Sequence, residues 1–280
     1  MRELSGTTAI ITGASRGIGV EIAKSLAERK VRIVLAARSA EALEAVRHDI
    51  TKEQTQAQIL TIPTDITDPN AQAHLVEQTL SKFGTIDLLI NNAGVVMLST
   101  SEQSMLRNIE QTIAVNLTAA MTLTQRVLSV MLEQNRGHIV NVASLSGLFG
   151  VGGGESYSAT KHGLVGFTRS LRLSLKVRKS SVSASVICPG FVKEVGMYAD
   201  RLSSGGNRAP FILGTTSVYA VSCAIIRAIE HDLPEVVVSP RPIRLLLALT
   251  ALSPRIGEWV LRQAGAHHVF EVGEYEQVPQ

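Results

Sequence analysis

A tyrosine and a lysine stand four residues apart in the segment YSATK, at Tyr157 and Lys161. In a helix this spacing places both side chains on one face. A tyrosine hydroxyl has an ordinary pKa of about 10, which is too high for efficient proton transfer at neutral pH. A neighbouring ammonium group favours the phenolate and lowers that pKa, so the pair predicts a general acid or base. Such an acid would protonate an oxygen atom of a substrate. Ser144, at the end of the apolar segment IVNVAS, is placed to hydrogen-bond that same oxygen.

Proton donation at an oxygen suits the reduction of a carbonyl, in which hydride reaches the carbon. The segment TGASRGIG at 12–19 predicts where a hydride-carrying dinucleotide binds, because it lies between an apolar run and a helical pattern. Glycines there permit a tight turn and close approach to a pyrophosphate, and a helix N-terminus offers unpaired N–H groups. Gly13, Gly17 and Gly19 have the spacing G-x-x-x-G-x-G rather than G-x-G-x-x-G. The glycines alone would also fit an ordinary turn, and their position after the first strand favours nucleotide binding.

The end of the second apolar segment, Ala36 to Arg38, predicts which dinucleotide binds. NAD sites usually have an acidic residue at this place, which hydrogen-bonds the ribose 2′-hydroxyl. This stretch contains no carboxylate. Arg38 and Arg16 are instead placed to flank a 2′-phosphate with charge-assisted hydrogen bonds. The sequence therefore favours NADP(H), with two ordinary surface arginines as the alternative.

Alternating apolar segments and helical patterns must position these residues. Buried strands joined by helices indicate an α/β fold, a Rossmann-like doubly wound parallel sheet of about seven strands flanked by helices. We expect this domain to span residues 1–240, and an amphipathic helical extension at 241–280 to pack on the same domain or on a partner. The strands are expected at 7–12, 31–38, 57–65, 86–94, 137–144, 182–190 and 235–240, and the helices at 18–30, 39–53, 69–84, 102–133, 157–176 and 214–231.

The order of these motifs resembles that of the short-chain dehydrogenase/reductase family over roughly residues 5–240. TGASRGIG, NNAG at 91–94, the asparagine of VNL, Ser144, YSATK and the PG pair at 189–190 carry the resemblance. It implies that Lys161 also binds the nicotinamide ribose, that Asn116 holds a water leading to solvent, and that Asp65 contacts the adenine amine. The implied catalytic residues are Asn116, Ser144, Tyr157 and Lys161. The implied coenzyme-binding residues are Gly13, Ser15, Arg16, Gly17, Ile18, Gly19, Arg38, Asp65, Ile66, Asn92, Ala93, Gly94, Tyr157, Lys161, Pro189, Gly190 and Val192.

Two stretches depart from the family pattern. After PG the family usually has a threonine that bonds the nicotinamide carboxamide, and this chain has Lys193 and Glu194 in that neighbourhood. Backbone groups at Val192 are the expected substitute. The leucine- and arginine-rich tail after Pro240 is similar to a branch that includes membrane-associated hydroxysteroid and retinal reductases. Such a tail can cover the substrate pocket, pair with a second subunit or lie in a membrane interface.

Composition and charge narrow the class of protein. The chain has 280 residues, of which 45% are hydrophobic and 18% charged, a balance that can bury a large core. Its net charge of +3 comes from scattered basic residues, so we expect no nucleic-acid partner. Cys188 and Cys223 match neither a disulfide framework nor a metal site, which indicates a reducing compartment and no metal. No signal peptide is expected, and the longest apolar run, LLLALTAL, is too short to span a bilayer.

We therefore expect an NADP(H)-dependent oxidoreductase that interconverts a carbonyl and an alcohol on an apolar ketone, aldehyde or 3-oxoacyl-type substrate. The segment 194–215 is expected to close over that substrate as a lid. The resemblance implies a homodimer or homotetramer formed through 102–133 and 157–176. We expect the protein in the cytoplasm. Weak membrane contact through the tail is an alternative to packing on the domain or on a partner. A non-catalytic dinucleotide-binding regulator or scaffold is the alternative, which Glu194 favours and the Ser144, Tyr157 and Lys161 set opposes. An epimerase or dehydratase on the same fold is a third hypothesis.

Overall fold

The computed structural model describes residues 3–97, 102–203, 205, 207–210, 213–263 and 265. Its strands are β1 (Thr8–Thr12), β2 (Arg32–Ala37), β3 (Ile59–Pro63), β4 (Leu88–Asn91), β5 (Gly137–Val142), β6 (Val182–Pro189), β7 (Phe191–Val192), β8 (Thr215–Thr216) and β9 (Glu235–Val238). Its α-helices are α1 (Ile18–Ala27), α2 (Ala40–Glu53), α3 (Pro69–Phe83), α4 (Glu102–Ile113), α5 (Ala119–Glu133), α6 (Glu155–Val177), α7 (Met197–Ser203), α8 (Val218–Glu230), α9 (Arg244–Leu252) and α10 (Pro254–Gln263).

Seven strands form one parallel sheet in the order β3-β2-β1-β4-β5-β6-β9. The chain builds outward from β1 to β3 and then returns to place β4 on the other side of β1. This reversal makes a topological switch point between β1 and β4, where ligands bind beyond the carboxyl ends of the strands. The prediction of a doubly wound sheet of about seven strands is confirmed.

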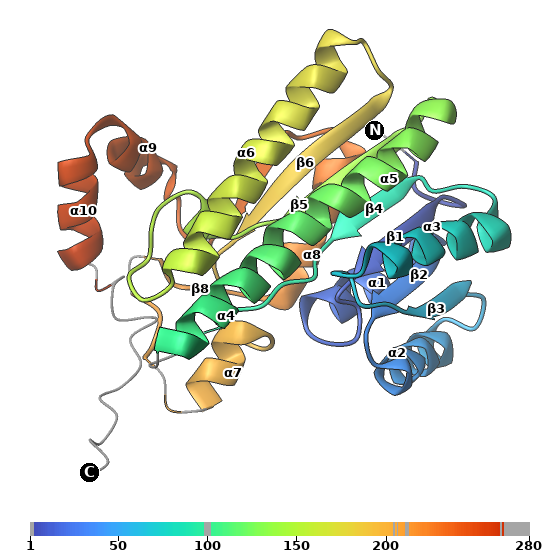
Figure 1. The fold of residues 1–280 in the computed structure, drawn as a ribbon, viewed down its shortest axis with the longest axis horizontal. Coiled ribbons are helices and arrows are strands. Elements are labelled where there is room, and N and C mark those ends of the chain that lie inside the picture. The colour runs from blue at the N-terminus through green and yellow to red at the C-terminus, as the bar shows by residue number, and fades with distance from the viewer. Residues whose placement is uncertain are drawn as a thin grey trace.

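Helices cover both faces of the sheet (Figure 1). Neighbouring residues of a strand point to opposite faces, so Ile10 and Ile11, both fully buried, belong to separate cores. Ile11 packs in the core that includes residues of α1, α2 and α8. Ile10 packs in the core that includes residues of α3, α5 and α6. Strands buried on both sides explain the continuous apolar runs in the sequence.

The structure divides the expected helix at 102–133. A π-helical turn at Ala114–Thr118 separates α4 from α5 and contains Asn116. Such turns occur often at functional sites, because the extra residue rotates the side chains that follow. The segment 194–215, expected as a lid, contains α7, while its residues 204, 206, 211 and 212 lie outside the described residues. β7 and β8 pair beside α7 and were not expected from the sequence.

The C-terminal extension begins as a helical hairpin of α9 and α10, which projects beyond the sheet in Figure 1. Gly257 permits the close crossing, because a Cβ added there would lie 2.7 Å from the Thr250 Cα. Leu246, Leu247 and Leu261 pack against a small apolar cluster that includes Phe149. Residues 264 and 266–280 of the predicted extension lie outside the described residues. Within the described ranges, no helix is both long and apolar enough to cross a bilayer.

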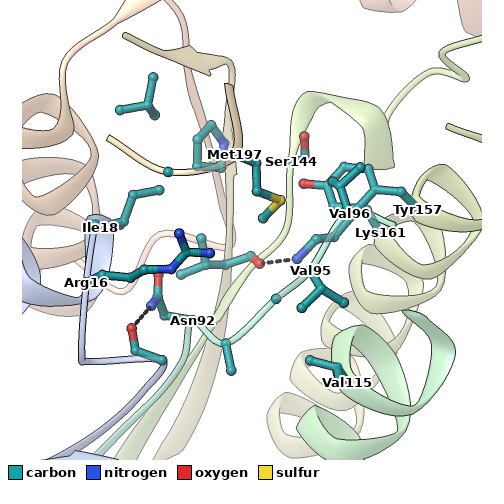
Figure 2. Close-up of a pocket in the computed structure, with 18 of the residues that line it drawn as sticks. Arg16, Ile18, Asn92, Val95, Val96, Val115, Ser144, Tyr157, Lys161 and Met197 are labelled. Carbon is teal, nitrogen blue, oxygen red and sulfur yellow. Dashed lines mark hydrogen bonds between the residues drawn. The ribbon is translucent and has the colours of Figure 1, made fainter. Parts of the chain in front are cut away.

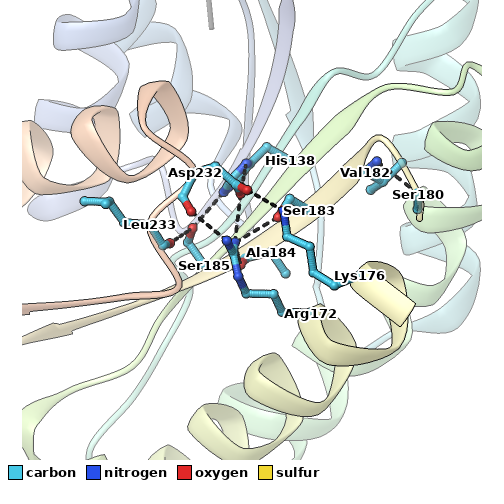
Figure 3. Close-up of polar contacts among 10 residues, drawn as sticks. All are labelled: His138, Arg172, Lys176, Ser180, Val182, Ser183, Ala184, Ser185, Asp232 and Leu233. Carbon is cyan, nitrogen blue, oxygen red and sulfur yellow. Dashed lines mark hydrogen bonds and ion pairs between the residues drawn. The ribbon is translucent and has the colours of Figure 1, made fainter. Parts of the chain in front are cut away.

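A polar cluster joins the opposite end of the sheet to α6 (Figure 3). Arg172 Nη1 donates to Asp232 Oδ1 at 2.8 Å and Lys176 Nζ donates to Asp232 Oδ2 at 2.7 Å. Arg172 also donates to the Ala184 carbonyl of β6, and His138 Nε2 lies 2.8 Å from Ser185 Oγ. Burial alone would raise the pKa of Asp232, but the hydrogen bonds from Arg172 and Lys176 outweigh it and hold that pKa well below its ordinary value. This cluster lies away from the switch point and holds the sheet together.

Candidate active site

A cavity of about 1030 Å³ lies at the carboxyl ends of β1, β2, β4, β5 and β6. This volume is at the upper end of the range for small-molecule sites, which suits a site for a dinucleotide and a second molecule. The predicted residues that line it are Gly13, Ser15, Arg16, Gly17, Ile18, Arg38, Asp65, Ile66, Asn92, Ala93, Gly94, Ser144, Tyr157, Lys161, Pro189, Gly190 and Val192. Gly19 and Asn116 lie behind this wall and support it.

The glycine-rich loop and the segment after β4 hold each other in place. Asn92 Nδ2 donates to the carbonyl oxygens of Thr12 at 3.0 Å and Gly13 at 3.2 Å. Gly13 has φ +65°, and a Cβ added there would lie 2.8 Å from the Ala93 Cα, so close packing requires glycine. Gly17 precedes α1, whose first turn has no side-chain cap. No side chain therefore caps the N–H groups of that turn, and Gly17 and Ile18 line the cavity, so an anion bound there could accept from these groups.

Asn116 holds the backbone of Val95, which lines the cavity. Its Oδ1 accepts from the Val95 N–H at 2.8 Å and its Nδ2 donates to the Val95 carbonyl at 2.8 Å. Gly94 lies directly beside these groups, because a Cβ added there would lie 3.4 Å from Asn116 Oδ1 and 3.5 Å from Lys161 Nζ. The side chain of Asn116 thus positions the backbone that passes Lys161. The water that it is predicted to hold stays a prediction.

Ser144, Tyr157 and Lys161 meet on one wall of the cavity, opposite Arg16 and Asn92 (Figure 2). Tyr157 and Lys161 come from the first two turns of α6, and Ser144 follows β5. Tyr157 and Ser144 share a side-chain hydrogen bond. Lys161 Nζ donates to the Val142 carbonyl at 3.0 Å and lies 5.6 Å from the centre of the Tyr157 ring. The spacing in YSATK therefore does place both side chains on one face of a helix.

Burial sets the protonation states of this pair. It raises the pKa of Tyr157 to about 12, although the Ser144 hydrogen bond opposes the rise. It also lowers the pKa of Lys161 to about 8. The direction for Tyr157 differs from the lowering predicted from the sequence, because removing a phenolate from water costs more than Ser144 restores. Tyr157 consequently keeps its proton at neutral pH, which is the state of a proton donor.

Two exposed arginines stand at the far end of the cavity, beyond β1 and β2. Arg38 and Arg16 both line it. Arg16 Nη1 donates to Asp200 Oδ2 of α7 at 2.9 Å, an exposed ion pair that ties α7 to the glycine-rich loop. Hydrogen bonds from the side chain and backbone of Thr67 lower the pKa of Asp65, and Arg38 adds a smaller effect in the same direction. Asp65 is therefore ionised beside Arg38 at neutral pH.

Glu194 has a structural partner. Its Oε2 accepts from the Val218 N–H at 3.2 Å, at the start of α8, where a negative charge is favourable. Val192 and Val195 line the cavity on either side of it. The glutamate found near the place of the family's usual threonine thus helps begin a helix, and this observation removes the main reason to favour a non-catalytic protein.

Sequence reasoning missed several cavity residues. Met197 and Tyr198 of α7 line it, and a Cβ on Gly94 would lie 3.8 Å from Met197 Cε. Phe149 and Val151 line it from the segment after Ser144. These residues carry no chemical motif, so only the fold shows that they surround the site. The apolar character expected for the lid segment 194–215 was the one indication of α7.

The fold and this site define a dinucleotide-dependent α/β oxidoreductase. The chain belongs to the short-chain dehydrogenase family, whose sequence model matches residues 7–204. No group of three or more potential metal-binding side chains occurs within the described part of the chain.

Three comparisons place the chain within that family. It is 37% identical over 268 residues to Ketoacyl reductase HetN of Nostoc sp., covering 92% of this chain and 91% of that protein. A short-chain dehydrogenase/reductase from Burkholderia phymatum in complex with NAD superposes with TM-score 0.80 at 26% identity, covering 91% of this chain and 96% of the other. Actinorhodin polyketide ketoreductase with NADPH superposes with TM-score 0.73 at 27% identity, covering 85% and 97%. Since these structures hold different coenzymes, the preference of this chain depends on its own residues.

Proposed function

We propose that this protein is an NADP(H)-dependent oxidoreductase that interconverts a carbonyl and an alcohol, with Tyr157 as the proton donor. The observation that carries the proposal is that Ser144, Tyr157 and Lys161 share one wall of a cavity whose other wall is the glycine-rich loop. The test is carbonyl-dependent consumption of NADPH across ketones, aldehydes and 3-oxoacyl thioesters, with the alcohol identified as product. Binding of NADPH without turnover of any carbonyl would favour the regulator instead.

The site residues fit a dinucleotide. Gly13, Gly17 and Gly94 line the cavity with backbone and no side chain, and the start of α1, which no side chain caps, would present N–H groups to a pyrophosphate. When bound, the coenzyme would supply or accept the hydride. Lys161, held by the Val142 carbonyl, would bind the nicotinamide ribose.

The catalytic residues would position the substrate oxygen and supply its proton. Ser144 would donate a hydrogen bond to the substrate oxygen and hold it against Tyr157. Tyr157 would then give its proton to that oxygen as the alcohol forms. Lys161, with a pKa of about 8, is close enough to neutral pH to return a proton to the site. Asn116 would keep the backbone at Val95 in place beside Lys161.

The coenzyme preference rests on Arg38 and Arg16. We expect Arg38→Ala to raise the Kd for NADPH by about 10- to 100-fold, because a hydrogen bond to a charged group contributes about 1.5–3 kcal/mol. The Kd for NADH should stay nearly unchanged, since it has no 2′-phosphate. Calorimetric titration of both coenzymes measures the difference, with Arg47→Ala on the exposed face of α2 as control. Equal weakening of NADPH and NADH would show that Arg38 does not recognise the phosphate.

The substrate class follows from the lining and from the relatives. Leu145, Phe149, Val151, Phe191 and Met197 give the catalytic end of the cavity an apolar surface. The relative from Nostoc sp. is named a ketoacyl reductase, and the solved relative with NADPH is a polyketide ketoreductase. We therefore favour an apolar ketone, aldehyde or 3-oxoacyl-type compound as the substrate.

Exposed apolar side chains on two helices support a homodimer or homotetramer. On α4 these are Met105, Leu106 and Ile109, and on α6 they are Leu173 and Val177, each at least 40% exposed. Both helices belong to the regions through which the family is expected to associate. An exposed apolar surface of this kind is typical of a protein interface.

The outer face of the α9–α10 hairpin supports weak contact with an anionic lipid surface. Leu245, Leu252 and Trp259 are 72%, 83% and 63% exposed. The segment 241–263 contains four arginines and one acidic residue. An apolar face flanked by basic residues is typical of helices that lie in a membrane interface.

Trp259 is the only tryptophan of the chain, so its fluorescence reports on this face. We expect its emission to shift to shorter wavelength with vesicles that contain an anionic phospholipid, because the indole leaves water. Leu252→Glu should weaken the shift at least several-fold, whereas Tyr219→Glu on α8 should leave it unchanged. Emission that does not respond to either anionic or neutral vesicles would contradict membrane contact.

A further inference from the structure

A second cavity, of about 390 Å³, lies between the α9–α10 hairpin and the segment that follows Ser144. Leu148, Phe149 and Gly150 form one side of it, and Ala251, Pro254 and Leu261 form the other. The hairpin and this segment thus line an open cavity whose volume matches part of a small ligand.

Phe149 lies between this cavity and the catalytic one. Its side chain lines both cavities and is 5% exposed. It packs in the same cluster as Leu145, the residue after Ser144, and as Leu261 of α10. The two cavities therefore lie on either side of this residue, and a molecule that extends from Ser144 to the hairpin would have to run along its ring.

The lining indicates what the second cavity binds. Its walls are mainly aliphatic, aromatic or glycine, and the two charged residues, Glu258 and Arg262, have opposite signs. The lining therefore carries no net charge that would attract an ion. A hydrocarbon chain matches these walls, because each buried methylene contributes about 0.8 kcal/mol.

We propose that the second cavity is a substrate subsite, which binds the far end of an elongated apolar carbonyl compound while its carbonyl group lies at Tyr157. The proposal rests on the proposed function and adds substrate length to it. It assigns the C-terminal hairpin the role of selecting long substrates over short ones.

Gly150 allows a direct test. A Cβ added there meets no atom within 4 Å, and its φ lies outside the left-handed region. Gly150 lines the second cavity and not the catalytic one. Gly150→Leu should therefore fill the subsite without disturbing Ser144, Tyr157 or the coenzyme. Ala251→Leu fills the same space from α9, and Ala45→Leu, at an exposed position of α2 that lines neither cavity, is the control.

The measurement is kcat/KM for a series of 3-oxoacyl thioesters of increasing chain length. Each methylene kept out of the subsite lowers kcat/KM by a factor of about four, from the free energy of burying it. We expect Gly150→Leu and Ala251→Leu to lower kcat/KM for the longest chains by tens of fold and to leave the shortest unchanged. Ala45→Leu should match the wild type at every length.

Three results would overturn the subsite. Equal losses for short and long substrates would indicate damage to the catalytic cavity, and unchanged kinetics would show that the space is not used. A change of oligomeric state without altered chain-length selectivity would indicate that a second copy of the chain, and not the substrate, packs into this cavity. Binding of a fluorescent long-chain fatty ketone, compared between wild type and Gly150→Leu, decides the matter separately from turnover. If no carbonyl is reduced and this probe still binds less to the variant, the proposed function fails while the subsite stands.

Discussion

Replacing Tyr157 by phenylalanine should lower kcat for carbonyl reduction by about 10²- to 10⁴-fold, the usual contribution of a positioned general acid. The ring stays buried beside Lys161, so the variant loses the proton and little of the packing. The Kd for NADPH should change by less than about fivefold, because one hydrogen bond contributes about 1 kcal/mol to binding. Steady-state kinetics and calorimetry on the same preparation measure both quantities.

Tyr219→Phe is the matched control, because Tyr219 is 62% exposed on α8 and outside the cavity lining. It should keep the wild-type kcat. If Tyr157→Phe keeps most of its activity while Ser144→Ala does not, the proton comes from another group and the assignment of Tyr157 is wrong.

The second large effect is a loss of coenzyme affinity on substitution of Gly19, which packs against the glycine-rich loop. A Cβ added there would lie 2.9 Å from the Ala14 Cα and would also collide with the Gly13 carbonyl. Both contacts are with backbone, so Gly19→Val must displace the loop that cradles the pyrophosphate. We expect NADPH affinity to fall by at least 100-fold and the free energy of unfolding by about 1–3 kcal/mol, as for other overpacked sites.

Ala45→Val, at an exposed position of α2 outside the cavity lining, separates this effect from the general cost of valine in a helix. This control should bind NADPH as the wild type does. Wild-type affinity in Gly19→Val, measured by calorimetry, would mean that the loop adapts freely and that its tight geometry is not required.

Local patterns predicted most of the sheet and the chemical centre of the site. The helix predicted at 39–53 is α2, and Ser39 caps it, with its Oγ accepting from the Ala42 N–H at 3.2 Å, because a serine before a helical pattern is a local signal. The pairing of Tyr157 with Lys161 follows from the helical repeat alone. Parallel strands bring their carboxyl ends to one edge, which is why Ser144 and the glycine-rich loop line the same cavity.

Features that depend on contacts distant in sequence were not predictable. Asn116 pairs with Val95, and Glu194 pairs with Val218, across separations that no local pattern reveals. The π-turn at 114–118 has no distinctive composition. The rise in the pKa of Tyr157 depends on how deeply the fold buries it, whereas its spacing to Lys161 indicated only a charged neighbour. The second cavity likewise exists only because α9 and α10 return to the segment after Ser144.

The most direct test of the central claim is the transfer of deuterium to a 3-oxoacyl thioester from NADPH in which both hydrogens at C4 of the nicotinamide ring are replaced by deuterium. We expect the label at the carbinol carbon of the alcohol product, detected by mass spectrometry, and no product from Tyr157→Phe on the same timescale. An unlabelled product, or tight NADPH binding with no product from any carbonyl compound tried, would contradict the assignment of this site as a carbonyl reductase.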